Sequence, residues 1–317
     1  MELLLDGGDE TRQMIFYGPG YPADWRLEGV MVITEGKIPY AGFETWYRIA
    51  GAPGVRVPLL TLHGGPGAAH DYLTTLDELA YERQIIYYDQ IGSGRSSADS
   101  APSRWTLEFF VGELENLIEA LDLRSYHLLG QSWGGMLAIA HASRRPSGLR
   151  SLILADTPIS IPEWAEEGRR LVSEMPDQYR KALEAGEAGG NLNTPEYREA
   201  LRAFMKKHML RSNLTDDFES EPTEVYLTMW GDNEMVPTGT MKNADLTPQL
   251  RDIRVPTLVL SGRYDQCTET IVKRTLSEIS DSRSVVFENS GHIPNIDERD
   301  AFNSAVRDFL EAAERAL

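Results

Sequence analysis

Between an apolar run and a helix-forming run stands the sequence Gly-Gln-Ser-Trp-Gly-Gly, residues 130–135, with Ser132 at its centre. The apolar run before it, residues 126–129, is typical of a buried strand, and residues 136–140 (MLAIA) favour a helix. A G-x-S-x-G motif between a strand and a helix is typical of a serine held on a sharp turn, where larger neighbours would clash. The pattern predicts that Ser132 is a nucleophile; an ordinary strand-to-helix turn is the competing interpretation.

A second glycine-rich stretch, HGGPG at residues 63–67, follows the predicted strand 58–62. Glycines there would let a backbone N–H group approach a substrate oxygen with no side chain in the way. The helix expected after Ser132 also points N–H groups and its positive end toward that serine. We expect the N–H groups of Gly65 and Trp133 to form an oxyanion hole. The alternative is that the HGGPG stretch is a plain Gly/Pro turn.

The base that would activate the serine is predicted to be His292. It follows the last predicted strand, and loops at the carboxyl edge of an open α/β sheet gather functional residues. The other five histidines of the chain are His63, His70, His127, His141 and His208. His63 precedes the serine, whereas this kind of site has its base last in the chain, so His63 is expected to be a structural loop residue.

The acid that would orient this base is predicted to be Asp265, which directly follows the predicted strand 256–261. The chain order serine, aspartate, histidine then fits a serine hydrolase built on an α/β sheet. Asp156, at the end of the preceding strand, remains a competitor, and Asp89 is a third candidate in a loop that reads as structural. The expected reaction runs through an acyl-enzyme, and no cluster with metal-ligand spacing is present, so no metal or cofactor is expected.

Strand and helix patterns alternate on both sides of the serine motif. Short runs that are apolar on both faces are typical of buried parallel strands, and apolar residues three or four apart are typical of helices that cover them. This alternation predicts the α/β-hydrolase fold, a mostly parallel, doubly wound sheet. The predicted strands cover residues 57–62, 84–89, 126–129, 149–155, 256–261 and 284–288, with an antiparallel hairpin at 31–34 and 43–49.

The alternation stops between residues 158 and 250, where helical patterns and turn-rich breaks replace the strands. We interpret this segment as a helical cap inserted into a hydrolase core made of residues 1–157 and 251–317. Residues 1–28 are expected to form an extended N-terminal arm with turns at residues 18–22. Five aromatic residues of the cap could line a pocket or form the cap's own core: Trp164, Tyr179, Tyr197, Tyr226 and Trp230.

The amino-acid composition excludes some classes of binding partner. The net charge is −18, from 49 acidic and 31 basic residues, and such a surface repels nucleic acids and anionic membranes. The single cysteine, Cys267, cannot form an intrachain disulfide, the N-terminus lacks the pattern of a signal peptide, and no apolar stretch is long enough to span a membrane. We therefore expect a cytoplasmic protein that binds neither nucleic acid nor a membrane. The oligomeric state is not predicted.

Three motifs together resemble those of the proline iminopeptidases, which belong with the related amino-acid amide hydrolases in the prolyl aminopeptidase family of serine peptidases. They are HGGPG at 63–67, YDQ at 88–90 followed by GSGRS at 92–96, and GQSWGG at 130–135. The likeness extends from about Gly29 to the C-terminus. It implies release of an N-terminal residue, often proline, from peptides or small amides.

The resemblance also implies acidic side chains that bind the free amino terminus. One is a cap glutamate, matched here by Glu234, although an ordinary solvated cap residue is the alternative. The family's second acid follows the triad aspartate, and here that position holds Gln266, which accepts a hydrogen bond without supplying charge. Gly64 is expected to line the same substrate site.

Two other functions stay open at this point. An esterase or lactonase, or an amidase for substrates without a free amine, would use the same triad, and Gln266 is the residue that keeps this alternative open. A non-catalytic receptor on the same fold is the alternative outside the enzymes. Epoxide hydrolysis and dehalogenation are disfavoured, because on this fold they use an aspartate where this chain has Ser132.

Overall fold

The computed structural model describes residues 3–7, 11–17, 30–54, 56–97, 102–212, 223–233 and 235–315. These residues form one ten-stranded sheet with the strand order β1-β2-β3-β4-β6-β5-β7-β8-β9-β10. The strands are β1 Leu3–Gly7, β2 Thr11–Tyr17, β3 Val30–Tyr40, β4 Phe43–Ala50, β5 Leu59–Leu62, β6 Ile85–Tyr88, β7 Tyr126–Gln131, β8 Leu149–Ala155, β9 Thr257–Gly262 and β10 Ser282–Phe287.

The sheet is antiparallel at one end and parallel from β6 to β10. Strands β5, β6 and β7 are buried at every position, which explains why their sequences are apolar on both faces. The predicted fold class is confirmed, and each predicted strand is present. Strand ends are shifted by at most two residues, except in the first hairpin strand, which was predicted at 31–34 and extends as β3 from Val30 to Tyr40. The extended arm expected before residue 28 pairs as β1 and β2 and lengthens the sheet, while the expected turn at 18–22 lies outside the described residues.

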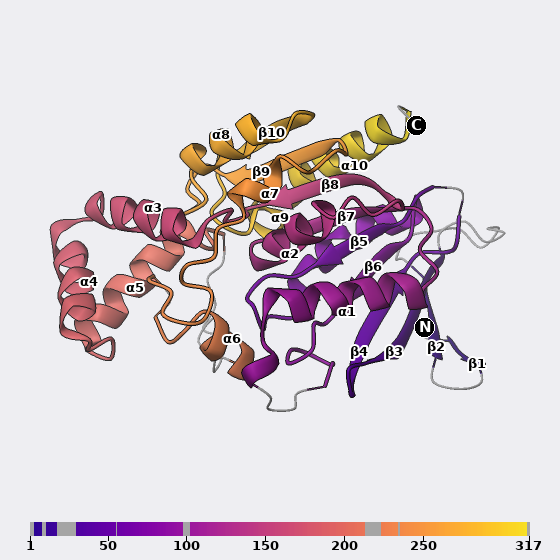
Figure 1. Ribbon diagram of the computed structural model, residues 1–317, viewed down its shortest axis with the longest axis horizontal. Coiled ribbons are helices and arrows are strands. Elements are labelled where there is room, and N and C mark those ends of the chain that lie inside the picture. Colours follow the sequence, from indigo (N-terminus) through magenta and orange to yellow (C-terminus); the bar gives the residue numbers. More distant parts are fainter. Residues whose placement is uncertain are drawn as a thin grey trace.

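Helices cover the sheet on both faces (Figure 1). One apolar core joins the sheet to α1 (Leu107–Ala120), α2 (Trp133–Ala142) and α8 (Glu269–Glu278). The other core contains the apolar face of the 3-10 helix η1 (Asp71–Tyr81) and of α10 (Arg299–Arg315). This layering brings the carboxyl ends of the parallel strands to one edge, where the loops that carry the candidate residues begin.

The segment between β8 and β9 is helical where the structure describes it. Three of its helices stand beside the sheet in Figure 1 and share an apolar cluster around Leu183, Tyr197 and Phe204 that is separate from the two sheet cores. The helices are α3 Ile161–Ser173, α4 Asp177–Gly189, α5 Pro195–His208, α6 Glu224–Met229 and α7 Thr247–Leu250, and the remaining short ones are η2 Pro102–Arg104 and α9 Pro294–Asp297. Among the described residues, no helix is both long and apolar enough to cross a membrane.

Candidate active site

Ser132 occupies a strained turn between β7 and α2. Its backbone has φ 55° and ψ −121°, a conformation that residues with a side chain rarely adopt. The turn is so tight that a Cβ atom on Gly130 would lie 2.2 Å from the carbonyl oxygen of Gly134. A Cβ on Gly134 would lie 2.2 Å from the carbonyl oxygen of Leu62. Glycine is therefore required on both sides of the serine, as its motif predicts.

The HGGPG loop lies beside this serine. A Cβ atom on Gly64 would be 3.2 Å from Ser132 Cβ and 2.6 Å from Gln131 Oε1. The Gly64 N–H donates to Tyr72 Oη at 2.7 Å, and Tyr72 Oη donates in turn to Gln131 Oε1 at 2.7 Å. Gly64 thus has no backbone donor left for a ligand, and a side chain at this position would clash with Gln131 and crowd Ser132.

Gly65 and Trp133 differ from Gly64 in this respect. Within the described part of the chain, neither the Gly65 N–H nor the Trp133 N–H donates a hydrogen bond. Trp133 is the first residue of α2, whose first-turn N–H groups have no partner inside the helix. The structure therefore leaves unpaired the two backbone donors that the sequence singled out.

Gln90, in the loop after β6, connects the two segments that carry these donors. Its backbone N–H donates to His63 Nε2 at 2.9 Å, and its side-chain Nε2 donates to the His63 carbonyl oxygen at 3.0 Å. Its Oε1 accepts from Trp133 Nε1 at 2.7 Å. His63 is fully buried, and this burial lowers the pKa of its imidazole. Since its Nε2 already accepts the Gln90 N–H, His63 has a structural role in this loop, as its place in the sequence predicted.

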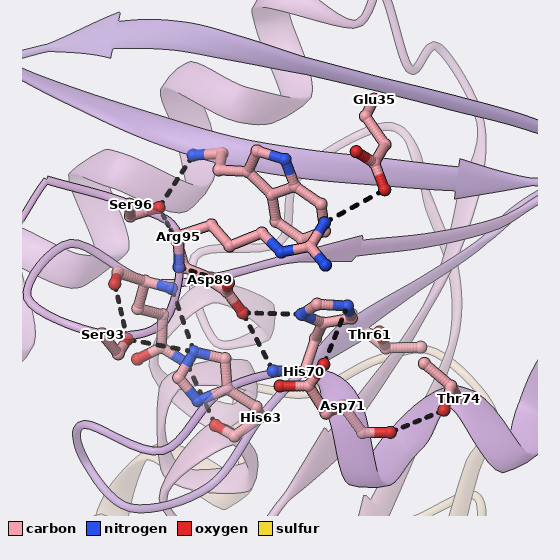
Figure 2. Close-up of polar contacts among 12 residues, drawn as sticks. Glu35, Thr61, His63, His70, Asp71, Thr74, Asp89, Ser93, Arg95 and Ser96 are labelled. Carbon is pink, nitrogen blue, oxygen red and sulfur yellow. Dashed lines mark hydrogen bonds and ion pairs between the residues drawn. The ribbon is translucent and has the colours of Figure 1, made fainter. Parts of the chain in front are cut away.

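Asp89 belongs to the same network, drawn in Figure 2. Its Oδ1 accepts from the backbone N–H and from Nδ1 of His70, at 2.9 and 2.8 Å, and its Oδ2 accepts from the Arg95 N–H at 2.8 Å. Burial would raise the pKa of Asp89, but the hydrogen bonds from His70 and Arg95 outweigh it, and the pKa is lowered. This carboxylate is occupied in shaping the loop and makes no contact with His292.

His292 and Asp265 are brought together from loops that follow β10 and β9. His292 Nδ1 lies 2.7 Å from Asp265 Oδ1, and because a carboxylate can only accept, Nδ1 carries the proton. Both side chains are buried. A hydrogen bond connects the Ser132 turn to the His292 loop: Gln131 Nε2 donates to the His292 carbonyl oxygen at 2.9 Å. Ser132 and His292, both described, share no direct hydrogen bond here, and such bonds are often long until a substrate binds.

Asp156, the competing acid, lies at the end of β8 in a left-handed conformation with φ 50°. Its Oδ1 accepts from the Gly262 N–H at 3.0 Å, and among the described hydrogen bonds none joins it to His292. Burial, and then the negative charge of Asp265, raise the pKa of Asp156 well above its usual range. Burial and the neighbouring carboxylate of Asp265 therefore favour the uncharged form of Asp156.

Cys267 is the third member of a compact group. Of the described residues, Asp265, Cys267 and His292 alone place potential metal ligands together, within 4.8 Å of one another. Burial and Asp265 raise the pKa of the Cys267 thiol well above its usual range, so the thiol is neutral and a poor ligand. Since Asp265 and His292 also bind each other, the trio suits a hydrogen-bonded pair with a small apolar neighbour better than a metal site.

A small cavity adjoins the His292–Asp265 pair on the side of α3 and α5. Gln266, buried at its edge, donates through Nε2 to the Trp164 carbonyl oxygen at 3.2 Å. Glu234 lies outside the described residues. Of the five cap aromatics, Trp164 lines the cavity, whereas Tyr179 and Tyr197 belong to the cap cluster and Tyr226 and Trp230 pack against the sheet core. The cavity is lined by Trp164, Phe204, Met205, His208, Met209, Met235, Asp265, Gln266 and His292.

Sequence reasoning missed four polar residues that shape this region: Tyr72, Gln90, Gln131 and His208. Gln90 and Gln131 stand inside the quoted motifs, so their position next to functional residues was a usable signal. Tyr72 and His208 gave none, because they reach the site only through the packing of η1 and α5.

Comparison with known proteins agrees with this geometry. Residues 57–299 match the family described as the alpha/beta hydrolase fold. The chain is 41% identical over 290 residues to a proline iminopeptidase of Lactobacillus helveticus (strain DPC 4571), covering 89% of this chain and 99% of that protein. A crystal structure of a Mycobacterium smegmatis proline iminopeptidase superposes with a TM-score of 0.83 at 36% identity, covering 89% of this chain and 99% of that one.

The crystal structure of VinJ is equally similar, with a TM-score of 0.83 at 39% identity over 88% of this chain and 98% of that one. These likenesses cover nearly the whole described core as well as the helical segment between β8 and β9. The chain therefore belongs to the proline iminopeptidase family of the α/β hydrolases.

Proposed function

We propose that this protein is a serine hydrolase that releases an N-terminal residue, proline or another small residue, from peptides or amino-acid amides. The observation that carries the proposal is the His292–Asp265 pair at 2.7 Å, tied through Gln131 to the strained turn of Ser132. The 41% identity to a proline iminopeptidase supports the choice of substrate. The peptide or amide is the partner, and no cofactor enters the reaction.

In this proposal His292 is the base and Asp265 holds it in the reactive tautomer. Since Nδ1 carries the proton shared with Asp265, the lone pair of Nε2 is available to take the hydroxyl proton of Ser132. Ser132 Oγ then attacks the carbonyl carbon that follows the N-terminal residue. His292 returns the proton to the leaving amine, and a water activated by the same histidine hydrolyses the acyl-enzyme.

The developing negative charge on the carbonyl oxygen is assigned to the N–H groups of Gly65 and Trp133. Support comes from their lack of other acceptors among the described residues, whereas the Gly64 N–H is used by Tyr72. The absence of a side chain on Gly64 lets the HGGPG loop approach Gln131 and Ser132 closely, which places the Gly65 segment beside the serine. Backbone donors that are fixed before the reaction stabilise such a charge most effectively.

The helical segment between β8 and β9 is proposed to act as the cap that closes over the N-terminal residue of the substrate. Gln266 lies at the boundary between this cap and the base, and Glu234 stays a proposed partner of the amino group. A cytoplasmic location is proposed because the free, buried Cys267 fits a reducing compartment. The esterase, lactonase and receptor alternatives are not favoured by the family assignment.

The test compares the hydrolysis of prolyl-, alanyl- and N-acetyl-prolyl-β-naphthylamide with that of a p-nitrophenyl ester. The wild type should cleave the free-amine amides and spare the blocked one. Ser132→Ala should abolish turnover of every substrate, whereas the control Ser143→Ala, at the end of α2, should keep it. Turnover of only the ester or the blocked amide would refute the exopeptidase assignment.

A further inference from the structure

The cavity beside His292 and Asp265 is mostly apolar, with Trp164, Phe204 and three methionines in its wall. Two nitrogen atoms of the lining residues nevertheless have no hydrogen-bond partner among the described residues: Nε1 of Trp164 and Nε2 of His208. Both side chains are more than nine-tenths buried, with 5% and 3% of their surface exposed. Buried polar groups are normally paired, so two unpaired groups in one cavity call for a ligand.

His208 is held in one tautomer. Its Nδ1 lies 2.5 Å from the carbonyl oxygen of Tyr264, and because a carbonyl only accepts, Nδ1 carries the proton. Burial lowers the pKa of His208 to about 4, so the ring is neutral near pH 7. The remaining nitrogen, Nε2, is therefore a lone-pair acceptor without a described partner, on a residue that lines a cavity with mostly apolar walls.

The cavity offers this acceptor to a group that enters next to the base. The ring of Trp164, which packs at 5.4 Å against His292, closes the other side. The one carboxylate among the described lining residues is Asp265, and its Oδ1 already accepts from His292. Gln266 is neutral. The chemistry that fits is a small, mostly apolar group that carries an N–H donor.

We propose that Nε2 of His208 accepts a hydrogen bond from the N-terminal nitrogen of the substrate. The apolar walls of the cavity then surround the side chain of the substrate's N-terminal residue. This inference rests on the proposed function and makes His208 a specificity-determining residue within it. It assigns part of the recognition of the amine to an uncharged acceptor, in a chain where Gln266 supplies no charge. Trp164 Nε1–H is a donor and cannot bind an N–H group, so it takes no part in this contact.

Two substitutions separate this role from a structural one. His208→Asn keeps an N–H donor near the position of Nδ1, facing Tyr264, and removes the Nε2 acceptor. His208→Gln does the reverse, because its side-chain oxygen can reach the position of Nε2. Trp105→Phe is the matched control, since it removes another buried indole nitrogen that has no partner among the described residues, keeps the aromatic ring and lies outside the cavity lining.

The readout is the ratio of kcat/KM for prolyl-β-naphthylamide to kcat/KM for p-nitrophenyl acetate, which has no amine. His208→Asn should lower this ratio about tenfold while the ester rate stays within about twofold, and His208→Gln and Trp105→Phe should keep the ratio. An equal loss on both substrates in His208→Asn, or an unchanged ratio, would overturn the proposal. A failure of the proposed function itself appears earlier, as a wild type that cleaves the ester but not the prolyl amide.

A measurement on the wild type covers the case in which neither His208 variant folds. The ¹⁵N resonance of His208 Nε2 should shift when proline, the expected product, saturates the enzyme, because a lone pair that accepts a hydrogen bond changes its shielding. His127 and His141, buried away from the cavity, serve as internal references and should not move. An unmoved His208 resonance in the presence of bound proline would overturn the proposal.

Discussion

The two sides of the site differ in how their polar groups are paired. On the Gln90 side, formed by His63, Asp89 and Gln90, the hydrogen bonds interlock and connect the two segments that carry the oxyanion donors. On the His208 side, formed by Trp164 and His208, one nitrogen of each residue lacks a partner among the described atoms.

This difference separates two tasks. Paired buried groups hold one geometry, which suits donors that must be in place before the reaction begins. Unpaired buried groups are unfavourable until a ligand satisfies them, which suits a surface that recognises a substrate. Substitutions on the Gln90 side should therefore act on kcat, and those on the His208 side on the choice of substrate.

The largest effect is expected at the acid. Asp265→Asn should lower kcat for prolyl-β-naphthylamide by roughly 10⁴-fold, because His292 would lose the acceptor that fixes its tautomer. Asp156→Asn should change kcat by less than about threefold, since burial and the charge of Asp265 already favour the uncharged form of that carboxyl. Steady-state kinetics of the two variants decide between the carboxyl groups, and a larger loss in Asp156→Asn would reverse the assignment.

The next effect tests the Gln90 side. Gln90→Met should lower kcat by about 10- to 100-fold and leave KM within about twofold, because both oxyanion segments lose the amide that aligns them. Gln178→Met, at an exposed position of α4, is the matched control and should behave as the wild type. A variant with raised KM and normal kcat would contradict a positioning role for Gln90.

Acid should lower stability through His208, and also through His63 on the Gln90 side, because burial lowers the pKa of both imidazoles. The folded pKa of His208, about 4, lies below the unfolded value of about 6.5, so between these values the unfolded chain binds the additional proton. Stability is therefore expected to fall as the pH drops from 6.5 to 4, and His208→Asn should flatten this dependence by up to about 1.4 kcal/mol per pH unit. Asp89 affects stability in a different pH range. Because its pKa is lowered in the folded state, its carboxylate stabilises the fold above about pH 4, and this contribution is lost only at lower pH.

Denaturant unfolding at pH 6.5, 5.5 and 4.5 measures this dependence. His141→Asn is a useful companion, because burial also lowers the pKa of His141 to about 4, far from the cavity. It should flatten the curve to a similar extent without changing substrate preference. Identical slopes for the wild type and His208→Asn would show that the folded His208 binds its proton as readily as the unfolded chain does.

The smallest effect is expected at Trp164. Trp164→Phe removes a buried N–H group that has no partner among the described residues and keeps most of the ring packing against His292. The free energy of unfolding should change by less than about 1 kcal/mol and can increase, because an unpaired donor is unfavourable in the folded state. Gln90→Met should destabilise the protein more, since it leaves partners unpaired, and an equal loss in both variants would erase the difference between the two sides.

Local sequence patterns were enough to predict most strands and helices of the fold. Apolar runs without alternation predicted the strands β5 to β9 because those strands are buried on both faces, and spacing of three to four residues predicted α1 and α10 because one face packs on the sheet. Strands β1 and β2 were expected only as an extended arm. Their pairing depends on β3, and no local pattern in residues 1–28 reveals that β3 will lie beside them.

For the site, the sequence by itself determined the serine turn, because only glycine fits at Gly130 and Gly134, and it ordered the candidates as Ser132, Asp265 and His292. The tertiary structure decided which of the neighbouring groups are already occupied. Asp89 is taken by His70, and the Gly64 N–H by Tyr72.

Only the tertiary structure shows that α5 contributes a residue to the site. The sequence placed His208 in a helix, but only the packing of that helix against the loops after β9 and β10 puts the His208 ring beside His292. The physical reason is that a motif reports the local backbone, whereas hydrogen-bond partners and buried charges come from segments far apart in the chain.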